Sequence, residues 1–362
     1  MNHGWKYRKL CDVAPAKSFD GDIAPTSEDK YWCLNLDKIE SDTGRIIEYD
    51  YLGSAELHGS ICKFSIENVL FSKLRPNLNK VVVPMQDGYC TTELVPLHPI
   101  KELNRKFLSY YLRNPKFVRV LVDKTGGAKM PRVKMNMFWD CEIPLPKLEI
   151  QNRIASELDK INELIEVKRS QLADLDLLAQ SLFYEMFGDP INNPKGWRTT
   201  LFGNLIRLKS GDALSAKFFC DGSYPVYGGN GIAGYHNRYN VSGENIIIGR
   251  VGALCGNVRF INGDIFVTDN AFVVKVQQNI KLRFLERMLT LLELRKYANA
   301  AAQPVISNTS LKAITIPIPP IELQNEFAAK IEAIEKQKEQ IESSITDLQT
   351  LLASRMDYWF ND

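Results

Sequence analysis

The sequence has no apolar run that approaches the about 20 residues needed for a membrane-spanning helix. The first ten residues are basic but lack the apolar stretch of a secretory signal. Neither sign of charge dominates, because 45 Lys and Arg face 43 Asp and Glu, a net charge of +2. We therefore expect a cytoplasmic protein without a membrane segment. Its 362 residues suggest two or three folding units.

The sequence also lacks the clustered ligands of a metal site. Its seven cysteines are scattered with no Cys-x-x-Cys spacing, and its four histidines are isolated from one another. A zinc site needs close pairs of ligands, and a disulfide scaffold needs a short chain dense in cysteine. We therefore expect reduced, mostly buried thiols and no metal ion bound by this chain.

Motifs of catalysis are missing as well. The sequence has no phosphate-binding P-loop, no Gly-x-Gly-x-x-Gly cofactor fingerprint and no metalloprotease or hydrolase signature. The segment Asn114–Phe117 lacks the second proline of the Asn/Asp-Pro-Pro-aromatic motif of adenine-methylating enzymes, and Glu166-Val167-Lys168, half of a nuclease motif, lies on a predicted helix. These absences predict a non-catalytic chain that carries no cofactor of its own.

What the sequence does contain is an internal repeat. IPLPKLEIQNRIASELDKI at 143–161 matches IPIPPIELQNEFAAKIEAI at 316–334, an offset of 173 that continues to the C-terminus. Upstream the match is looser: ENVLFSKL matches ENIIIGRV and KFLSYYL matches RFLERML at an offset of 177, and GWKYRKL resembles GWRTTLF. The repeat predicts four parts, namely a lobe at 1–145, a helix at 146–190, a lobe at 191–318 and a helix at 319–362.

Each repeated tail predicts a long helix that begins after an extended Ile-Pro-x-Pro segment. Apolar residues recur with the alternating spacing of three and four that is typical of a coiled-coil seam. The predicted seam consists of Ile154, Leu158, Ile161, Ile165, Leu172, Leu175, Leu182, Phe327, Ile331, Ile334, Ile341, Ile345, Leu348 and Leu352. Because one apolar stripe is poorly stable alone, we expect the two helices to pack as an antiparallel coiled coil with pseudo-two-fold symmetry. A lysine interrupts each seam, Lys168 and Lys338, and either fixes the register or extends its charge out to solvent.

Both lobes predict mixed sheet and helix, an α+β class. In lobe one, strands at 69–71 and 81–83 flank the polar segment 72–80, and in lobe two, strands at 246–248 and 257–261 flank 249–252. A helix is predicted after each, near 104–122 and 281–299. Lobe two also has a Gly-Gly-Asn-Gly run after Tyr227, which suits either a loop close to a flat ligand or a tight turn without function.

The charge is divided unevenly among the four parts. Residues 1–145 carry +3 and residues 191–318 carry +8, whereas the helical parts 146–190 and 319–362 carry −4 and −5. A cationic patch is the electrostatic sign of nucleic-acid binding. Acidic helices would repel a phosphate backbone, so their exposed faces should meet protein or water.

Taken together, these motifs resemble the specificity (S) subunit of type I restriction–modification systems along the whole chain. The resemblance rests on the repeated lobe starts, LFSKLRPNLNK in lobe one, YGGNGIAGYHNRY and IIIGRVG in lobe two, and IPLPKLEIQN and IPIPPIELQN before the helices. It implies two target recognition domains that each read half of a bipartite DNA site, and a helical spacer between them. It also implies methyltransferase subunits using S-adenosylmethionine, and restriction subunits that use ATP and Mg²⁺, as partners alongside double-stranded DNA. Lobe one departs from the commoner pattern because it has no Gly-Gly-Asn-Gly loop.

Candidate DNA contacts follow from side-chain chemistry, since Arg and Asn can read base edges and Lys mostly holds phosphates. They are Lys73, Arg75, Asn77, Lys80, Lys129, Arg132 and Lys134 in lobe one, and Tyr227, Asn230, His236, Arg238 and Arg250 in lobe two. Two other hypotheses remain open. The chain could be a protein-interaction scaffold without DNA binding, or an enzyme, for example a nuclease, whose site the sequence does not reveal.

Overall fold

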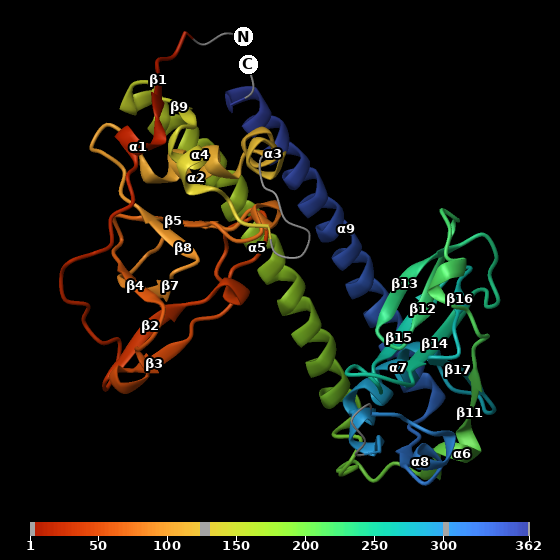
Figure 1. Ribbon diagram of the computed structural model, residues 1–362. Helices are drawn as coiled ribbons and strands as arrows, with labels where there is room; N and C mark the ends of the chain where they lie inside the picture. The colour runs from red at the N-terminus through yellow and green to blue at the C-terminus, as the bar shows by residue number, and fades with distance from the viewer. Residues whose placement is uncertain (1–3, 124–130, 300–303, 361–362) are drawn as a thin grey trace. The chain divides into compact units, whose positions relative to one another are not determined.

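The chain divides into two compact units, and the division passes through two long helices (Figure 1). The computed structural model describes residues 4–123, 131–299 and 304–360. Unit one comprises 1–168 and 344–362, and unit two comprises 169–343. The helices are α5 (Leu148–Phe187) and α9 (Ile321–Phe360), each of 40 residues. Each unit therefore contains one lobe and half of each helix. Within the described residues, no helix has both the length and the apolar character of a membrane span.

Proline and glycine explain the limits of these helices. Each helix follows a Pro-x-Pro segment, which cannot continue a preceding helix and fixes an extended backbone. Helix α5 ends at Phe187, directly before Gly188, whose φ of +79° is the left-handed conformation typical of the residue after a helix. The local signals thus define the two helices predicted from the repeat.

Lobe one contains sheets of two, three and four strands. The order β1-β9 joins Tyr7–Lys9 to Glu142–Pro144, and β6-β5-β8 joins Val81–Val82, Val69–Ser72 and Leu94–Leu97. The order β3-β2-β7-β4 joins Tyr51–Gly53, Lys30–Leu34, Gly88–Thr91 and Ile61–Phe64. The helices are α1 (Leu10–Val13), α2 (Arg105–Arg113), α3 (Pro115–Asp123) and α4 (Met135–Trp139), with 3-10 turns at Leu36–Lys38, Ser54–Glu56 and Pro76–Leu78.

Lobe two has a similar architecture, but its equivalent sheets differ in the number of strands. The order β10-β18 joins Thr199–Leu201 to Thr315–Pro317, and β13-β12-β16 joins Gly231–His236, Tyr224–Gly228 and Phe266–Val267. The order β11-β17-β14-β15 joins Ile206–Ser210, Ala271–Val276, Glu244–Gly249 and Val258–Asn262. The helices are α6 (Phe202–Leu205), α7 (Leu282–Leu291) and α8 (Asn308–Lys312), with 3-10 turns at Ala216–Phe218 and Leu294–Tyr297. Strands β5, β6 and β8 lie 177 residues before β14, β15 and β17, so the weak upstream repeat is a repeat of the sheet.

The helices predicted near 104–122 and 281–299 are each interrupted, and that prediction was wrong in detail. Asn114 adopts an extended conformation (ψ 131°) at the end of α2, directly before Pro115. The residue before a proline is disfavoured in the helical region, which explains why α3 starts anew. In lobe two, Glu293 has φ +50° and separates α7 from the 3-10 turn that follows.

The repeated glutamine of the Glu-x-Gln motif fastens each long helix to its own lobe. The Gln151 side chain is completely buried, accepts the Asn104 backbone N–H at 2.8 Å and donates to the carbonyls of Glu102 at 2.9 Å and Pro146 at 2.7 Å. Gln324 repeats this arrangement, accepting from Lys281 N–H at 3.0 Å and donating to the Pro319 carbonyl at 2.9 Å. The glutamine thus satisfies backbone groups at a helix start and at the proline segment, which explains why both tails carry it.

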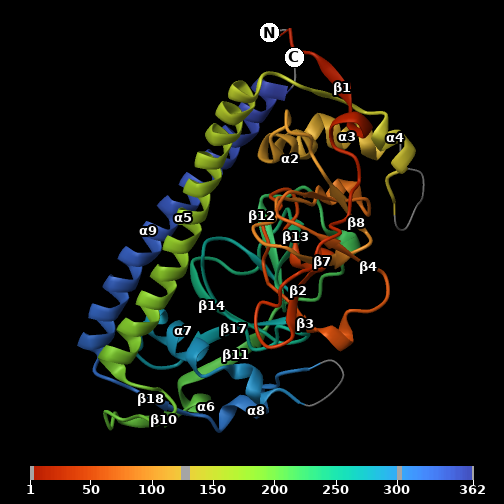
Figure 2. The same cartoon turned by 90° about the vertical axis from the view of Figure 1, so that its left-hand side faces the viewer.

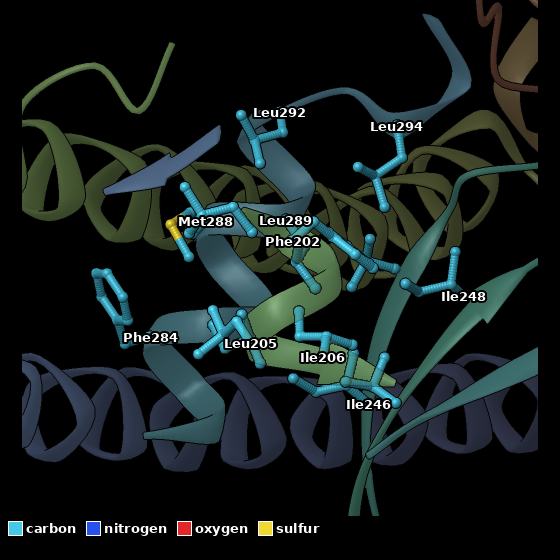
Figure 3. Packing of buried hydrophobic residues seen from close by; sticks show 14 of the residues in the cluster. Phe202, Leu205, Ile206, Ile246, Ile248, Phe284, Met288, Leu289, Leu292 and Leu294 are labelled. Carbon is cyan, nitrogen blue, oxygen red and sulfur yellow. The ribbon is translucent and has the colours of Figure 1, made fainter. Parts of the chain in front are cut away.

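The hydrophobic core of each unit includes side chains of the long helices. Figure 3 shows the cluster of unit two, to which α6, β11, β14, α7 and the 3-10 turn after α7 contribute. The labelled side chains are Phe202, Leu205, Ile206, Ile246, Ile248, Phe284, Met288, Leu289, Leu292 (directly after α7) and Leu294. Phe183 and Phe187 of α5 join it, with ring centroids 5.7 and 4.7 Å from that of Phe284. The heptad analysis did not predict these two phenylalanines, because they lie beside the seam and face the lobe.

Within each unit, half of α5 lies against half of α9 (Figure 2). In unit one, Glu157 pairs with Arg355 and accepts a hydrogen bond from Trp359 Nε1 at 3.2 Å. In unit two, Asp176 pairs with Lys338 at 2.8 Å. The early part of α5 therefore meets the late part of α9, and the late part of α5 meets the early part of α9, as antiparallel helices require.

The predicted seam residues are all buried or half-buried. Of the two lysines in the seam, Lys338 is half-buried and contacts Glu335 as well as Asp176. Burial lowers the pKa of Lys338, but the hydrogen bond to Asp176 and the charge of Glu335 outweigh it, so the pKa lies above its usual value. Its ammonium group is thus directed to carboxylates at the edge of the seam. Lys168 is half-buried as well.

Candidate nucleic-acid interface

The same backbone pairing holds one segment of each lobe, 72–80 in lobe one and 249–252 in lobe two, which we call the basic segment. In lobe one, Leu74 forms a bridge with Arg132, and the N–H of Arg75 donates to the Pro131 carbonyl at 2.8 Å. In lobe two, Val251 forms a bridge with Val305, and the N–H of Gly252 donates to the Pro304 carbonyl at 3.1 Å. These are equivalent positions of the repeat. The segment after the central strand is therefore fastened to the segment before the long helix in both lobes.

In lobe one this pairing brings predicted residues into one neighbourhood. The Lys73 carbonyl accepts the Val133 N–H at 2.8 Å, so Lys73 and Arg75 lie beside Arg132 and Lys134 along the paired segments. Arg75 and Asn79 have φ values of +50° and +49°, uncommon for residues with a side chain. Such conformations often occur at functional sites, and here they present Arg75 and Asn77 exposed at the surface.

The other predicted residues of lobe one differ in the exposure of their charged groups and in the partners that these groups bind. The Lys80 ammonium is half-buried and donates to the Leu36 carbonyl at 2.6 Å, and burial lowers its pKa, opposed by the charge of Asp37. Arg132 pairs with Glu93 at 2.7 Å but is 61% exposed. Lys134 is exposed, and Lys129 lies outside the described residues. Lys80 is therefore the least available of these cations for a phosphate.

In lobe two the glycine-rich run is a tight hairpin between β12 and β13, with Gly228 opposite Gly231. A side chain at Gly229 would place its Cβ 2.5 Å from the Val251 carbonyl oxygen, and one at Gly249 would lie 2.3 Å from the Gly229 carbonyl oxygen. The glycines thus permit two backbones to touch, and the run forms a tight turn, one of the two alternatives that the sequence left open. The contact places the exposed tip residue Asn230 beside the segment that starts at Arg250.

Arg250 is half-buried, and neighbouring groups hold its guanidinium. Nη1 donates weakly to the Asp269 carbonyl at 3.5 Å, and Cζ lies 5.3 Å from the ring centroid of Phe272. Tyr227 lies on the same hairpin as Asn230, and its carbonyl accepts the Thr268 N–H at 2.9 Å. Burial raises the pKa of the Tyr227 phenol, opposed by the nearby charge of Arg259. Tyr227, Asn230 and Arg250 therefore lie together, with the phenol protonated at neutral pH.

His236 and Arg238 lie at the other end of β13, five residues or more from the turn, which is about 17 Å of extended chain. The His236 Nδ1 accepts the Arg238 backbone N–H at 3.0 Å, and the imidazole lies 5.4 Å from the ring of Phe266. Arg238 is exposed. The structure thus separates the predicted residues of lobe two into two groups.

The sequence analysis did not select Arg259, which holds the hairpin from β15. Its Nη2 donates to the Asn230 carbonyl at 3.2 Å, so it fixes the residue at the tip of the turn. The only local signal was a basic residue among the apolar residues Val258, Phe260 and Ile261 of the same strand. Its partner lies 29 residues away, a pairing that spacing cannot reveal.

The site has no arrangement for metal chemistry in the described part of the chain. There, no group of three or more His, Cys, Asp or Glu side chains could hold a metal ion. The candidate residues that the structure describes carry guanidinium, ammonium, amide and phenol groups. These groups can donate hydrogen bonds to phosphates and to base edges.

Comparison with known proteins identifies a family whose model matches this chain. The family model for the type I restriction modification DNA specificity domain matches residues 2–176 and again 194–348. The EcoprrI specificity subunit of Escherichia coli is 30% identical over 266 residues, covering 69% of this chain and 64% of that protein. The MjaIX specificity subunit of Methanocaldococcus jannaschii is 24% identical over 233 residues, covering 57% of this chain and 52% of that protein. The matches thus span between half and two thirds of these two relatives.

Solved structures share the fold over almost the whole chain. The crystal structure of the S subunit of a type I restriction–modification system from M. genitalium has a TM-score of 0.60 at 17% identity, covering 99% of this chain and 96% of that one. A chain from a study of complex assembly and conformational transition of the type I system has a TM-score of 0.56 at 20% identity, covering 98% and 97%. The two matched segments cover the lobes and most of each long helix, so the chain belongs to the family of type I restriction modification DNA specificity domains, of which it carries two copies.

Proposed function

We propose that this chain is the non-catalytic, sequence-specific DNA-recognition subunit of a type I restriction–modification complex. Each lobe reads one half of a bipartite site. The observation that carries the proposal is the presence of two copies of the specificity domain in one chain, each with its basic segment held by the same backbone pairing. Two copies with unlike side chains at that place suit two different half-sites.

The chemistry of the two segments supports different kinds of contact. In lobe one, Lys73, Arg75 and Asn77 combine phosphate-holding and base-reading side chains. In lobe two, Asn230 and Arg250 can each form bidentate contacts, with adenine and guanine edges respectively. The larger net charge of lobe two, +8 for residues 191–318, predicts the stronger salt dependence.

The antiparallel helices set the spacer between the half-sites and dock methyltransferase subunits, and their acidic exposed faces suit a protein partner better than DNA. In this proposal S-adenosylmethionine binds to the methyltransferase subunits, and ATP and Mg²⁺ to a restriction subunit that translocates DNA. The chain contributes recognition and positioning, with the chemistry supplied by those partners.

Selection of bound DNA from random duplexes tests the proposal, with the chain alone and with methyltransferase subunits added. We expect enrichment of two short sequences separated by a fixed gap, and affinity that falls steeply with salt. No retention of DNA even with the partner subunits would contradict the proposal and favour a protein-interaction scaffold. Incubation with Mg²⁺ and DNA should give no cleavage, and cleavage by the purified chain would instead indicate an enzyme.

A further inference from the structure

Two thiols face one another across neighbouring strands of lobe one. Cys62 on β4 and Cys90 on β7 are direct partners in the antiparallel register, and their sulfur atoms are 3.3 Å apart. Residues directly opposite on antiparallel strands have Cα atoms about 4.5–5.5 Å apart. That separation lies inside the range of about 4.4–6.8 Å found in disulfides. A bond between these sulfurs therefore needs side-chain rotation and no movement of the strands.

The two thiols differ in access and acidity. Cys90 is completely buried, whereas Cys62 is half-buried. The hydrogen bond with Cys90 lowers the pKa of Cys62, burial opposes this, and the charge of Lys73 adds to it. The same hydrogen bond, together with burial, raises the pKa of Cys90. Cys62 is thus the more exposed residue of the pair, and its thiol ionises before that of Cys90, which favours its reaction with an oxidant.

The remaining cysteines and the second lobe offer matched controls. Cys11 and Cys220 are exposed. The Cys141 thiol donates to the Met137 carbonyl at 3.3 Å. At the 177-residue offset, the positions of Cys62 and Cys90 correspond to Tyr239 and Val267, so lobe two has no thiol at the equivalent place. The thiol pair is therefore a property of lobe one.

We propose that Cys62 and Cys90 form a reversible disulfide when the protein meets a hydroperoxide. The Cys62 thiolate attacks the peroxide, the O–O bond breaks, and the leaving oxygen takes a proton and departs as water or an alcohol. Cys62 is then a sulfenic acid. The Cys90 sulfur attacks the Cys62 sulfur, the S–O bond breaks, and water departs with the Cys90 proton. The two sulfurs together lose two electrons and the peroxide gains two, while a dithiol reverses the reaction by thiol exchange.

The bond would lie next to the basic segment of lobe one. Directly after β7, the Glu93 carbonyl accepts the Lys73 N–H at 3.0 Å, and its carboxylate pairs with Arg132. A disulfide fastens β4 to the strand that leads into this turn. Oxidation would therefore stiffen the support of Lys73 in one lobe while leaving the other lobe unchanged.

The test treats the intact chain with one equivalent of hydrogen peroxide, blocks remaining thiols by alkylation and maps linked peptides by mass spectrometry. We expect a peptide joining Cys62 to Cys90, the loss of two of the seven thiols, and their return after treatment with dithiothreitol. Cys62→Ser should abolish the linked peptide, whereas Cys11→Ser, at an exposed cysteine outside the pair, should leave it unchanged.

Two outcomes would overturn the proposal. One is oxidation of Cys62 no faster than of the exposed Cys11 and Cys220, with no linked peptide. The other is a Cys62 sulfenic acid that persists while Cys90 remains open to alkylation after unfolding. Because the map is made on the unaltered chain, it decides the question even if a cysteine variant fails to fold, and it does not depend on DNA binding.

Discussion

The two lobes repeat the core strands β5, β6 and β8 as β14, β15 and β17 but differ in the elements that present their polar side chains. In lobe one, β2 and β3 are joined by a long connection with a 3-10 turn, and the segment after β5 has two residues with positive φ. In lobe two, β12 and β13 form a tight glycine hairpin, and the segment after β14, which has the same length, carries glycine at its two positive-φ positions, Gly252 and Gly256. The difference shows that the sheets and the glutamine anchors form a common frame, on which each lobe carries its own surface chemistry.

Mutation of the sheets and of the two buried glutamines should reduce stability most. The two glutamines, Gln151 and Gln324, should differ in the size of this loss. Gln151→Ala leaves three buried or partly buried backbone groups without their partner, whereas Gln324→Ala leaves two. At about 1 kcal/mol or more for each group, we expect losses of about 3 and about 2 kcal/mol. Denaturant unfolding of the single variants measures both. The exposed neighbour variant Asn325→Ala should stay near the unaltered protein, and equal small losses for both glutamines would refute the anchor.

The hairpin of lobe two gives the next largest effect. Gly229→Ala should destabilise unit two by about 2 kcal/mol, because its Cβ would overlap the Val251 carbonyl oxygen. Gly228→Ala is the matched control, since its Cβ would meet no atom closer than 3.8 Å. Hydrogen exchange resolved by peptide should show faster exchange in 206–276 for Gly229→Ala alone. Similar exchange in the two variants would mean that the backbone contact is unimportant.

Equivalent cations in the two lobes should differ in DNA binding. Arg250 and Lys73 lie 177 residues apart, at matching positions of the repeat. We expect Arg250→Ala to weaken binding by about 10- to 100-fold and to relax base preference, because a guanidinium can read a guanine edge. Lys73→Ala should weaken binding less and equally for all sequences. Titration of duplexes altered in one half-site measures both, and unchanged affinity and preference for Arg250→Ala would remove that residue from the interface.

The smallest expected effect concerns pH. Glu286 on α7 corresponds to Ser109 on α2, and burial raises the pKa of this carboxyl, opposed first by Arg287. A carboxyl with a raised pKa in the folded state favours folding at low pH, and this contribution is lost as pH rises from about 4.3, the usual Glu value, through the folded-state pKa. Glu286→Gln should therefore make unit two slightly more stable at pH 7. Urea unfolding across this range checks the sign, and a destabilised variant at pH 7 would contradict it.

The sequence predicted those features whose signals are local. Proline segments and heptad spacing placed the helices to within a few residues, and the repeat placed the paired strands. Contacts between distant segments could not be predicted, since Arg259 supports Asn230 from a different sheet and Glu93 supports Lys73 from the turn between β7 and β8. How far an individual cation is available to bind DNA also depends on such distant partners. The chosen DNA contacts, Lys80 and Arg132 among them, stay predictions for that reason.

The most direct measurement is a map of methylated adenines in host DNA, made with the unaltered chain and with a chain whose residues 191–318 are replaced by the second lobe of another family member. The account predicts a bipartite methylated sequence in which one half-site changes and the other half-site remains. A change in both half-sites, or methylation that is the same with and without this chain, would contradict independent reading by two lobes.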